Sequence, residues 1–554
     1  MVRNFFILIF LTLASCQPKA QFDLVLRNGT IYDGTGSEPV EADIAISGDT
    51  IAAIGDLSKA DARKTIDING LAVAPGFINM LSWANESLIE DGLSQSDIRQ
   101  GVTLEVFGEG TSDGPLTDWM KRNRTQLQGD IKYRISWTTL REYLDFLVRK
   151  GVSCNVATFV GATTVRIHEI GYADRPPTPD ELERMKQLVR QAMEEGAVGL
   201  SSSLIYAPAL FAETRELTEL AKVAAEYDGL YITHLRSEGA KFLEAIDEMI
   251  TIAKTAGIRT EIYHLKAAGQ QNWAKMDAAI AKIDSARQSG LQLTADMYTY
   301  TAAATGLDAC MPPWVQEGGT KVWVSRLLDP GIRARLKEEI LEPGENWENF
   351  YDLAGSPDNI LLVGFAVDSL KKYTGMTLSA IAAARKTGPV ETMMDLVAYN
   401  QQDVSTVYFL MSEDNVKKQI KLPYVSFGSD SESLSPEGVF LKSNIHPRAY
   451  GTFARLLGKY VRDEKVIPLQ EAIRRLTSLP AENLRLDRRG KLTSGFYADM
   501  VVFDPSRIND PATFTKPHQF STGMVHVFVN GTQVLKDGEH TGAKPGRAVK
   551  RRKD

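Results

Sequence analysis

Three pairs of polar side chains follow successive apolar runs in the middle of the chain, and their residue types suit metal binding and catalysis. The pairs are His234 with Arg236, His264 with Lys266, and Asp296 with Tyr298. Residues two apart in an extended chain point to the same face. A single histidine in such a place is more often a hydrogen-bonded structural residue than a ligand. Because His234 and His264 occupy matched places in successive units, we predict instead that they share one metal ion with an open water position.

Two carboxylates end other apolar runs. Asp430 follows the run 424–427, where it could take a proton from a metal-activated water and pass it to a leaving amine. Glu109 follows the run 102–107 and could be a third metal ligand. Asp430 could instead cap a turn, and Glu109 could instead be a surface turn carboxylate. We carry both forward as site candidates.

The elements that must position these residues repeat along the chain. A helix, a glycine and a short apolar run recur at intervals of about 30 residues, with the glycines Gly196, Gly229, Gly257 and Gly290. The helix of the first unit begins with Thr178 as its cap, Pro179 in the first turn and Glu181 at the capping-box position. One α/β unit per repeat predicts parallel strands that are buried on both faces.

Extending this pattern outwards predicts eight parallel strands. Four lie in the repeats just described, and the others are Leu71 to Ile78, Val102 to Phe107, Ser153 to Val160 and Tyr424 to Phe427. This favours an α/β fold built on a (β/α)8 TIM-like barrel, in which chemistry takes place at the C-terminal ends of the strands. A doubly wound open sheet is disfavoured, because no glycine-rich phosphate fingerprint follows the first strand.

Short strands and turns flank the barrel. Residues 22–70 and 481–545 read as two parts of one small β domain built from both chain ends, around a barrel at 71–480. The stretch 311–423 is too long for one α/β unit, so we expect an inserted lid within it. Residues 546–554 form a basic tail.

The composition narrows the function classes. The 554 residues include only seven histidines and three cysteines, which disfavours a cysteine-rich zinc scaffold, a disulfide framework and an iron–sulfur cluster. The formal net charge is −7, so nothing points to a nucleic-acid partner. Oligomeric state leaves no trace in the sequence.

The first sixteen residues have the layout of a signal peptide. Arg3 precedes an apolar run from Phe5 to Leu11, and Ala14-Ser15 stand directly before Cys16. A small-residue pair before cysteine resembles a bacterial lipobox, in which the cysteine is lipidated. We expect an exported periplasmic or outer-membrane lipoprotein anchored at Cys16, with a plain signal peptide as the alternative.

The chain resembles the amidohydrolase superfamily, and within it the N-acyl-D-amino-acid deacylases, or D-aminoacylases. The resemblance covers most of the mature chain and rests on the segments 74–78 (APGFI), 100–103 (QGVT), 233–239 (THLRSEG), 263–266 (YHLK), 296–300 (DMYTY), 428–430 (GSD), 446–453 (HPRAYGTF) and 495–499 (GFYAD). It implies the barrel with a small β domain and cleavage of the amide of N-acylated amino acids.

The resemblance also implies roles for individual residues. His234 and His264 would bind one zinc ion, and Asp430 would be the general acid and base. The candidates for holding the carboxylate and carbonyl of a small-molecule N-acyl amino acid are Arg236, Lys266 and Tyr298. The sequence leaves other substrates open, namely dipeptides, N-acyl-L-amino acids and cyclic amides, as well as a non-catalytic binding lipoprotein.

The sequence departs from the family pattern at two places. Most superfamily members carry His-x-His after the first strand, but here Leu81 and Trp83 stand there and cannot bind a metal. The sequence therefore predicts that a second metal site is mostly dismantled. D-aminoacylases also place a cysteine ligand at the position of Gly110, and Glu109 beside it could replace that thiolate. Two histidines and one glutamate form a known catalytic zinc ligand set.

Overall fold

Eight parallel strands form a closed barrel at the centre of the computed structural model, which describes residues 20–344 and 347–552. The strands are β6 (Phe77–Asn79), β7 (Val102–Phe107), β8 (Asn155–Thr158) with its continuation β9 (Val160–Gly161), β10 (Gly199–Ser203), β11 (Leu230–His234), β12 (Arg259–Ile262), β13 (Leu293–Met297) and β18 (Val425–Phe427). They pair in chain order. The ring closes where the Met80 amide donates to the Phe427 carbonyl at 3.2 Å. The predicted (β/α)8 barrel is thus confirmed.

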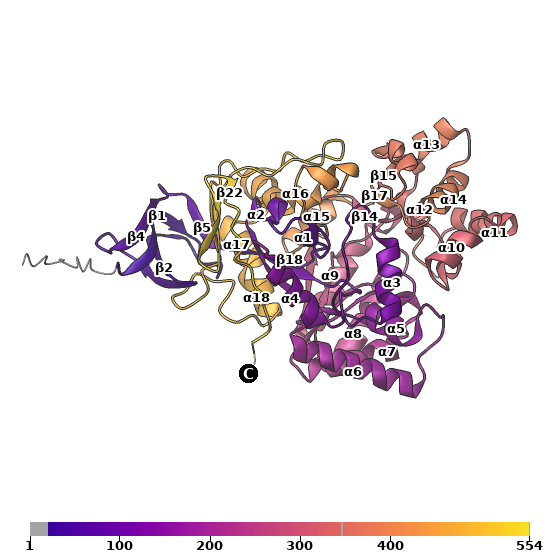
Figure 1. Cartoon of the computed structure of the whole chain (residues 1–554), viewed down its shortest axis with the longest axis horizontal. Helices are drawn as coiled ribbons and strands as arrows, with labels where there is room; N and C mark the ends of the chain where they lie inside the picture. The colour runs from indigo at the N-terminus through magenta and orange to yellow at the C-terminus, as the bar shows by residue number, and fades with distance from the viewer. Residues whose placement is uncertain (1–19, 345–346, 553–554) are drawn as a thin grey trace, which may run out of the picture.

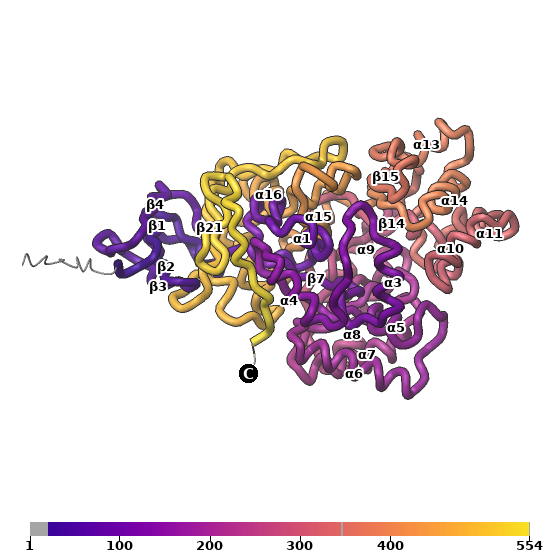
Figure 2. The backbone as a smooth tube through the Cα atoms, viewed as in Figure 1, coloured from indigo at the N-terminus to yellow at the C-terminus, as the bar shows by residue number. Residues whose placement is uncertain are grey.

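Helices cover the outside of the barrel (Figures 1 and 2). They are α1 (Ser87–Glu90), α2 (Gln95–Ile98), α3 (Asp118–Leu127), α4 (Leu140–Lys150), α5 (Ala162–Ile170), α6 (Pro179–Glu195), α7 (Thr214–Ala225), α8 (Phe242–Ala256), α9 (Lys275–Gln288), α15 (Glu413–Ile420), α16 (Arg448–Arg455), α17 (Leu469–Leu476) and α18 (Ser478–Asn483). In α6 the Thr178 hydroxyl and the Glu181 carboxylate form the expected capping box. Gly196 ends this helix with φ 118°, a backbone conformation that favours glycine.

A β domain built from both chain ends lies at one end of the molecule. Its strands are β1 (Phe22–Ile31), β2 (Val40–Ser47), β3 (Thr50–Gly55), β4 (Ala62–Asp67), β5 (Ala72–Pro75), β19 (Met500–Phe503), β20 (Met524–Val529), β21 (Thr532–Lys536) and β22 (Glu539–His540). The two chain ends join where β5 pairs antiparallel with β19, with Ala74 opposite Val501. The sequence prediction that both ends build one domain is confirmed.

The first predicted strand, Leu71 to Ile78, is wrong as a single strand. Its first half is β5 of the β domain and its second half is β6 of the barrel. The chain passes between the two sheets at Gly76, where a Cβ atom would overlap the side chain of Thr103. A glycine is required at this close approach, so the apolar run 71–78 is divided by packing that its hydrophobicity does not reveal.

An insertion follows β13 and lies at the end of the molecule opposite the β domain (Figure 1). It has a sheet of β14 (Ala303–Gly306), β15 (Ile360–Gly364), β16 (Met376–Thr377) and β17 (Ser405–Tyr408), with α10 (Thr320–Arg326), α11 (Pro330–Leu341), α12 (Phe350–Ala354), α13 (Leu378–Arg385) and α14 (Pro389–Asn400). These elements enclose an apolar core of their own, which includes Leu336, Ile381 and Met393. The insertion begins earlier than the expected range 311–423, because β14 already belongs to its sheet.

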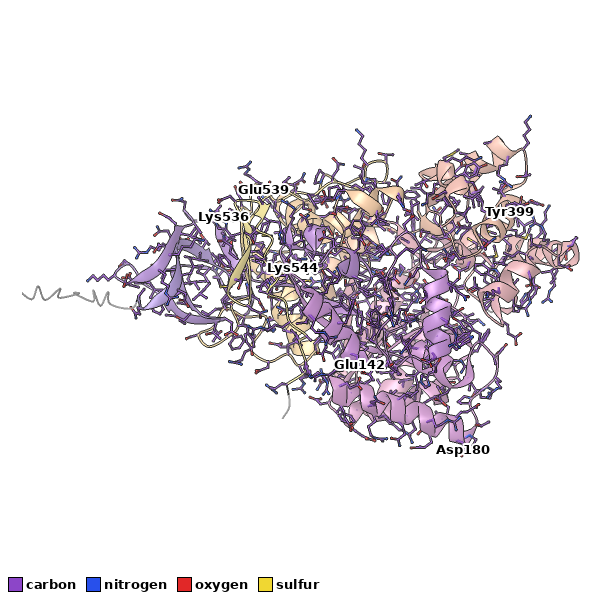
Figure 3. The ribbon with its side chains drawn as sticks, in the orientation of Figure 1. Glu142, Asp180, Tyr399, Lys536, Glu539 and Lys544 are labelled. Atoms are coloured by element: carbon purple, nitrogen blue, oxygen red, sulfur yellow. The ribbon has the colours of Figure 1, made fainter. Side chains whose placement is uncertain are left out.

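The described residues of the basic tail expected at 546–554 pack against the barrel. The Val549 amide donates to the Val156 carbonyl at 2.8 Å, and the Arg552 amide donates to the Arg485 carbonyl at 2.8 Å. Figure 3 shows how the chain reaches this point, with Lys536 and Glu539 on the last β-hairpin and Lys544 closer to the barrel. The described part of the basic segment therefore belongs to the folded body.

The expected signal peptide and Cys16 lie outside the described residues. Within residues 20–344 and 347–552, no helix combines the length and the apolar character needed to cross a bilayer. The two cysteines in this part of the chain, Cys154 and Cys310, are both buried and free.

Candidate metal centre and active-site cavity

A cavity of about 490 Å³ lies at the C-terminal ends of the barrel strands. The barrel contributes polar side chains to its wall, among them His234, His264 and Asp430. The insertion contributes the facing wall, including Phe350 and Val363. Catalytic residues of (β/α)8 enzymes lie at this end of the barrel, so the cavity is the candidate active site.

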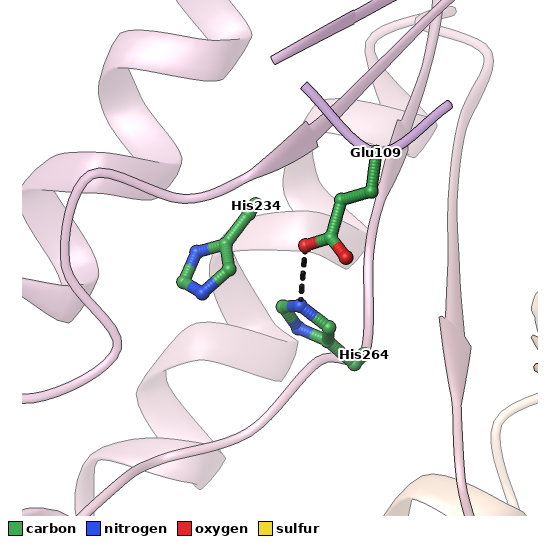
Figure 4. A group of neighbouring side chains, drawn as sticks. All are labelled: Glu109, His234 and His264. Atoms are coloured by element: carbon green, nitrogen blue, oxygen red, sulfur yellow. Dashed lines mark hydrogen bonds and ion pairs between the residues drawn. The ribbon is translucent and has the colours of Figure 1, made fainter. Parts of the chain in front are cut away.

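Glu109, His234 and His264 meet on the barrel side of this cavity (Figure 4). One ligand atom from each residue lies within 4.8 Å of the others, and all three side chains are buried. Oε1 of Glu109 lies 3.0 Å from Nε2 of His264. The structure therefore brings together the three residues that the sequence analysis selected as ligands.

The backbone around Glu109 explains why the glutamate and not its neighbour supplies the ligand. Gly108 and Gly110 on either side have φ values of 103° and 65°, which turn the chain sharply after β7. A Cβ atom on Gly110 would overlap the side chain of Ser203. A cysteine at position 110 has no room here, whereas Glu109 points into the cavity.

His264 has an unusual backbone conformation that turns its ring toward the other ligands. Its φ is 33°, a region that residues other than glycine rarely adopt. Asp296 holds this conformation, because its Oδ1 accepts the His264 backbone N–H at 2.7 Å. Asp296 thus contributes to the site by holding the backbone of His264 in place.

The surroundings of His234 favour the neutral imidazole that a metal ligand requires. Its Nδ1 lies 3.0 Å from the Leu235 carbonyl oxygen, an acceptor that requires the proton on Nδ1 and leaves Nε2 unprotonated. Burial lowers the pKa of His234 to about 4, which also favours the neutral ring. The hydrogen bond to a backbone carbonyl is the usual way in which proteins fix the tautomer of a metal-binding histidine.

Glu238 and Lys266 surround the other nitrogen of His264. Oε1 of Glu238 lies 3.0 Å from His264 Nδ1 and 2.6 Å from Lys266 Nζ. Burial and the Lys266 ammonium lower the pKa of His264, but the carboxylates of Glu238 and Glu109 outweigh them and raise it to about 10. Glu238 was missed in the sequence analysis, although it lies only four residues after His234 in the same segment.

Asp430 lines the same cavity as His234 and His264. Its φ of 51° turns the carboxylate into the cavity, where Oδ2 lies 2.7 Å from Nη1 of Arg448. Burial raises the pKa of Asp430, and the Arg448 guanidinium opposes part of that shift. A carboxylate with raised proton affinity next to a metal site is suited to accept and release a proton.

Arg448 is a second residue that the sequence analysis missed, although it lies in the segment 446–453. Its guanidinium stacks over the ring of Tyr298 at 4.6 Å. Among the described residues no hydrogen-bond partner reaches its buried Nε. Tyr298 and Lys266, the other two candidates for substrate binding, also line the cavity.

The prediction that Arg236 faces the substrate is wrong. Its guanidinium pairs with both oxygens of Glu248 at 2.8 Å and donates to the Leu210 and Ala212 carbonyls. It lies on the wall of another cavity. The same-face argument requires an extended chain, but β11 ends at His234, so the strand alternation stops before position 236.

The donor set fits a catalytic metal site. Two imidazole nitrogens and one carboxylate oxygen converge from three strand ends, and they line a cavity rather than a closed core. Three protein ligands with one side open distinguish catalytic zinc sites from structural ones, which have four.

Comparisons with known proteins agree with this geometry. Residues 367–535 match the amidohydrolase family. The chain is 31% identical to a D-aminoacylase of Alcaligenes xylosoxydans xylosoxydans over 96% of this chain and 98% of the relative. It is 30% identical to an N-acyl-D-glutamate deacylase of the same organism, over 96% and 97% of the two chains.

Solved structures show the same likeness. A crystal structure of a D-aminoacylase matches with a TM-score of 0.78 and 30% identity, over 96% of this chain and all of that one. An N-acyl-D-glutamate deacylase from Bordetella bronchiseptica, complexed with zinc and a phosphonate inhibitor, matches with a TM-score of 0.78 and 29% identity over 95% and 99%. The chain therefore belongs to the D-aminoacylase family of the amidohydrolase superfamily.

Proposed function

We propose that this protein is a metal-dependent hydrolase that cleaves the amide bond of N-acyl-D-amino acids. The observation that carries the proposal is the convergence of Glu109, His234 and His264 within 4.8 Å beside the cavity that also exposes Asp430. The D-configuration and the acyl amino acid follow from the relatives, whose names specify D-aminoacylase and deacylases of N-acyl-D-glutamate and N-acyl-D-aspartate.

A zinc ion held by these three residues would polarise the scissile carbonyl and activate water. Asp430 accepts the proton of the attacking water and delivers it to the amide nitrogen as the C–N bond breaks. The products are a free amino acid and a carboxylic acid. We propose a single zinc ion, because Leu81 and Trp83 offer no ligand atoms for another. A solved D-aminoacylase with which this chain shares 30% identity is described as activated by one metal and attenuated by a second.

Arg448 is our candidate for holding the substrate's α-carboxylate. Its Nε is buried and its guanidinium faces the same cavity as Asp430. Arginine binds carboxylates through paired N–H donors, which fixes both position and orientation. Lys266 is less available, because its single ammonium is already 2.6 Å from Glu238, whereas Arg448 pairs with Asp430 through Nη1 and keeps an Nε that has no hydrogen-bond partner among the described residues.

The charge of the cavity favours a substrate with a neutral side chain. Among the described residues that line the cavity, the only lysine is Lys266 and the only arginine is Arg448. Each of them already lies beside a carboxylate. Glu432 adds a further carboxylate to the wall, as does Asp403, whose pKa is raised by burial and by the neighbouring Asp308. A substrate with a second carboxylate would meet no unpaired lysine or arginine among the described residues of the wall, so N-acyl-D-leucine or N-acyl-D-methionine suits the cavity better than N-acyl-D-glutamate.

We further propose that the protein is exported and anchored through Cys16. The support is the sequence of residues 1–16 alone. Radiolabelled palmitate incorporated by the parent and not by the Cys16→Ser variant would support lipidation, and equal labelling of the two would refute it.

The proposed reaction is tested with the metal-loaded protein and a panel of N-acetyl-D- and N-acetyl-L-amino acids. We expect turnover of neutral D-substrates that disappears on chelation and returns with added zinc. Preferred turnover of L-substrates, dipeptides or cyclic amides would reassign the substrate. An absence of metal together with no turnover of any of these would refute the proposal.

A further inference from the structure

The indole of Trp83 lies between the two carboxylates of the site. Its Nε1 is 3.1 Å from Oε2 of Glu109 and 3.2 Å from Oδ1 of Asp430. The ring is half-buried and forms part of the cavity wall. One neutral N–H donor therefore lies between two acidic side chains, beside the oxygens that are not turned toward His264 and Arg448.

The backbone fixes this arrangement. The Asp430 amide donates to the Leu81 carbonyl at 2.9 Å, and the Trp83 amide donates to the Ser431 carbonyl at 3.0 Å. Ser82 and Ser431, next to these hydrogen-bonded residues, form a parallel β-bridge. The backbones of Trp83 and Asp430 are thus held together by hydrogen bonds that continue from the one between Met80 and Phe427 that closes the barrel.

The two oxygens of each carboxylate have different partners, and Trp83 is one of them in both cases. In Glu109, Oε1 faces His264 while Oε2 faces Trp83, so a single oxygen is turned toward the histidine pair. In Asp430, Oδ1 faces Trp83 while Oδ2 faces Arg448. Leu81 is buried and fills its position with apolar contacts rather than a ligand.

We propose that Trp83 is a positioning residue that stands in place of a second cation between Glu109 and Asp430. Its N–H keeps Glu109 as a one-oxygen ligand and sets the orientation of Asp430, so the site takes one ion. A proton donor can satisfy both oxygens without bringing a positive charge, and its bulk fills the space that a second ion would need. This inference rests on the metal site of the proposed function.

The first test measures metal rather than activity. The parent, Trp83→Phe and the control Trp119→Phe are equilibrated with excess zinc, desalted and analysed by plasma mass spectrometry, and affinity is measured by chelator competition. Trp119 is 47% exposed and lies outside the cavity. We expect one ion per chain in the parent and the control, and about tenfold weaker binding in Trp83→Phe, as is typical when an outer partner of a metal ligand is lost.

The second test restores the ligands. The variant Leu81→His/Trp83→His is expected to bind two ions per chain, with circular dichroism confirming that it is folded. In turnover assays Trp83→Phe is expected to lower kcat about tenfold with KM changed less than twofold, because orientation of Asp430 affects the chemical step.

Three results would overturn the inference. They are two ions in the parent, one ion in the folded double histidine variant, and a Trp83→Phe variant with the metal affinity and kcat of the parent. Failure of the proposed function is a separate outcome: a parent that binds one ion and shows the Trp83 dependence of affinity, but hydrolyses no N-acyl amino acid, would refute the reaction and leave the role of Trp83 standing.

Discussion

The ammonium of Lys266 and the carboxylate of Glu238 lie 2.6 Å apart, and both are buried against His264. Oε1 of Glu238 is at the same time 3.0 Å from His264 Nδ1. A carboxylate on the outer nitrogen of a histidine orients the ring and makes its other nitrogen a better ligand. Glu238 therefore supports the metal site through His264, while Lys266 compensates its negative charge.

The Glu238→Gln variant tests this support. We expect metal affinity to fall 10- to 100-fold because His264 loses its anionic partner. We also expect the free energy of unfolding to fall by about 3 kcal/mol, because Lys266 keeps a buried charge without a counterion. Chelator competition and denaturant unfolding measure the two effects. Glu244→Gln, an exposed substitution on α8, is the control, and equal metal affinity in the two variants would contradict the assignment.

Glu109→Gln tests the third ligand. The amide keeps the shape of the side chain but loses the negative charge, so we expect loss of the metal after desalting and loss of chelator-sensitive turnover. Gly110→Ala is the companion variant. It should leave the ligand set intact but lower stability, because its Cβ overlaps Ser203 and its φ is 65°. Full metal content in Glu109→Gln would remove Glu109 from the ligand set.

Much of the fold could be predicted because its signals are local. The apolar strand of each repeat and the glycine that ends each helix are visible without knowledge of partners, and they place His234 and His264 at adjacent strand ends. The division of residues 71–78 at Gly76 depends instead on a contact with Thr103. That residue is distant in sequence and comes close to Gly76 only when the barrel forms.

The same limit applies to the site. Arg236 and Lys266 have the same spacing from their histidines, yet one points to Glu248 and the other into the cavity. The difference arises after the strands end, where His264 adopts φ 33° and redirects the chain. Strand alternation carries no information beyond the last residue of a strand, so the two positions could not be distinguished from spacing.

Asp430→Asn is expected to separate metal binding from chemistry. The amide cannot accept the proton of water, so kcat should fall about 10³-fold, within the usual range for loss of a general base. Metal content should remain at the parent level, because Asp430 is outside the three-residue ligand group. Stopped assays over long incubations measure the residual rate. A variant that retains more than a tenth of the parent kcat would exclude Asp430 as the acid and base.

Arg448→Gln and Arg236→Gln form a matched pair that tests the reassignment of the carboxylate-binding residue. We expect Arg448→Gln to raise KM about 10- to 100-fold, because a charged hydrogen bond to a carboxylate contributes roughly 1.5–3 kcal/mol. Arg236→Gln should leave KM near the parent value and lower the melting temperature, since Arg236 pairs with Glu248. The opposite pattern in steady-state kinetics would return the role to Arg236.

The buried carboxylate of Glu348 leads us to expect that the free energy of unfolding depends on pH. It lies in the insertion, where its carboxylate accepts hydrogen bonds from the Ser237 hydroxyl at 2.7 Å and the Glu238 amide at 2.9 Å. Burial raises the pKa of Glu348 to about 7, whereas an unfolded glutamate has a pKa of about 4.3. The folded state therefore disfavours the ionised form.

The sign of the effect follows from linkage. Below pH 4.3 Glu348 is protonated in both states and does not affect the free energy of unfolding. Between about pH 4.3 and 7 the unfolded state ionises first, and above pH 7 the full penalty of about 4 kcal/mol is present. Glu348→Gln removes this penalty. The melting temperature of the variant minus that of the parent should therefore increase as the pH rises from 5 to 8. Glu338→Gln, exposed on α11, should show no such gain. A difference between Glu348→Gln and the parent that is constant over this range would contradict the raised pKa.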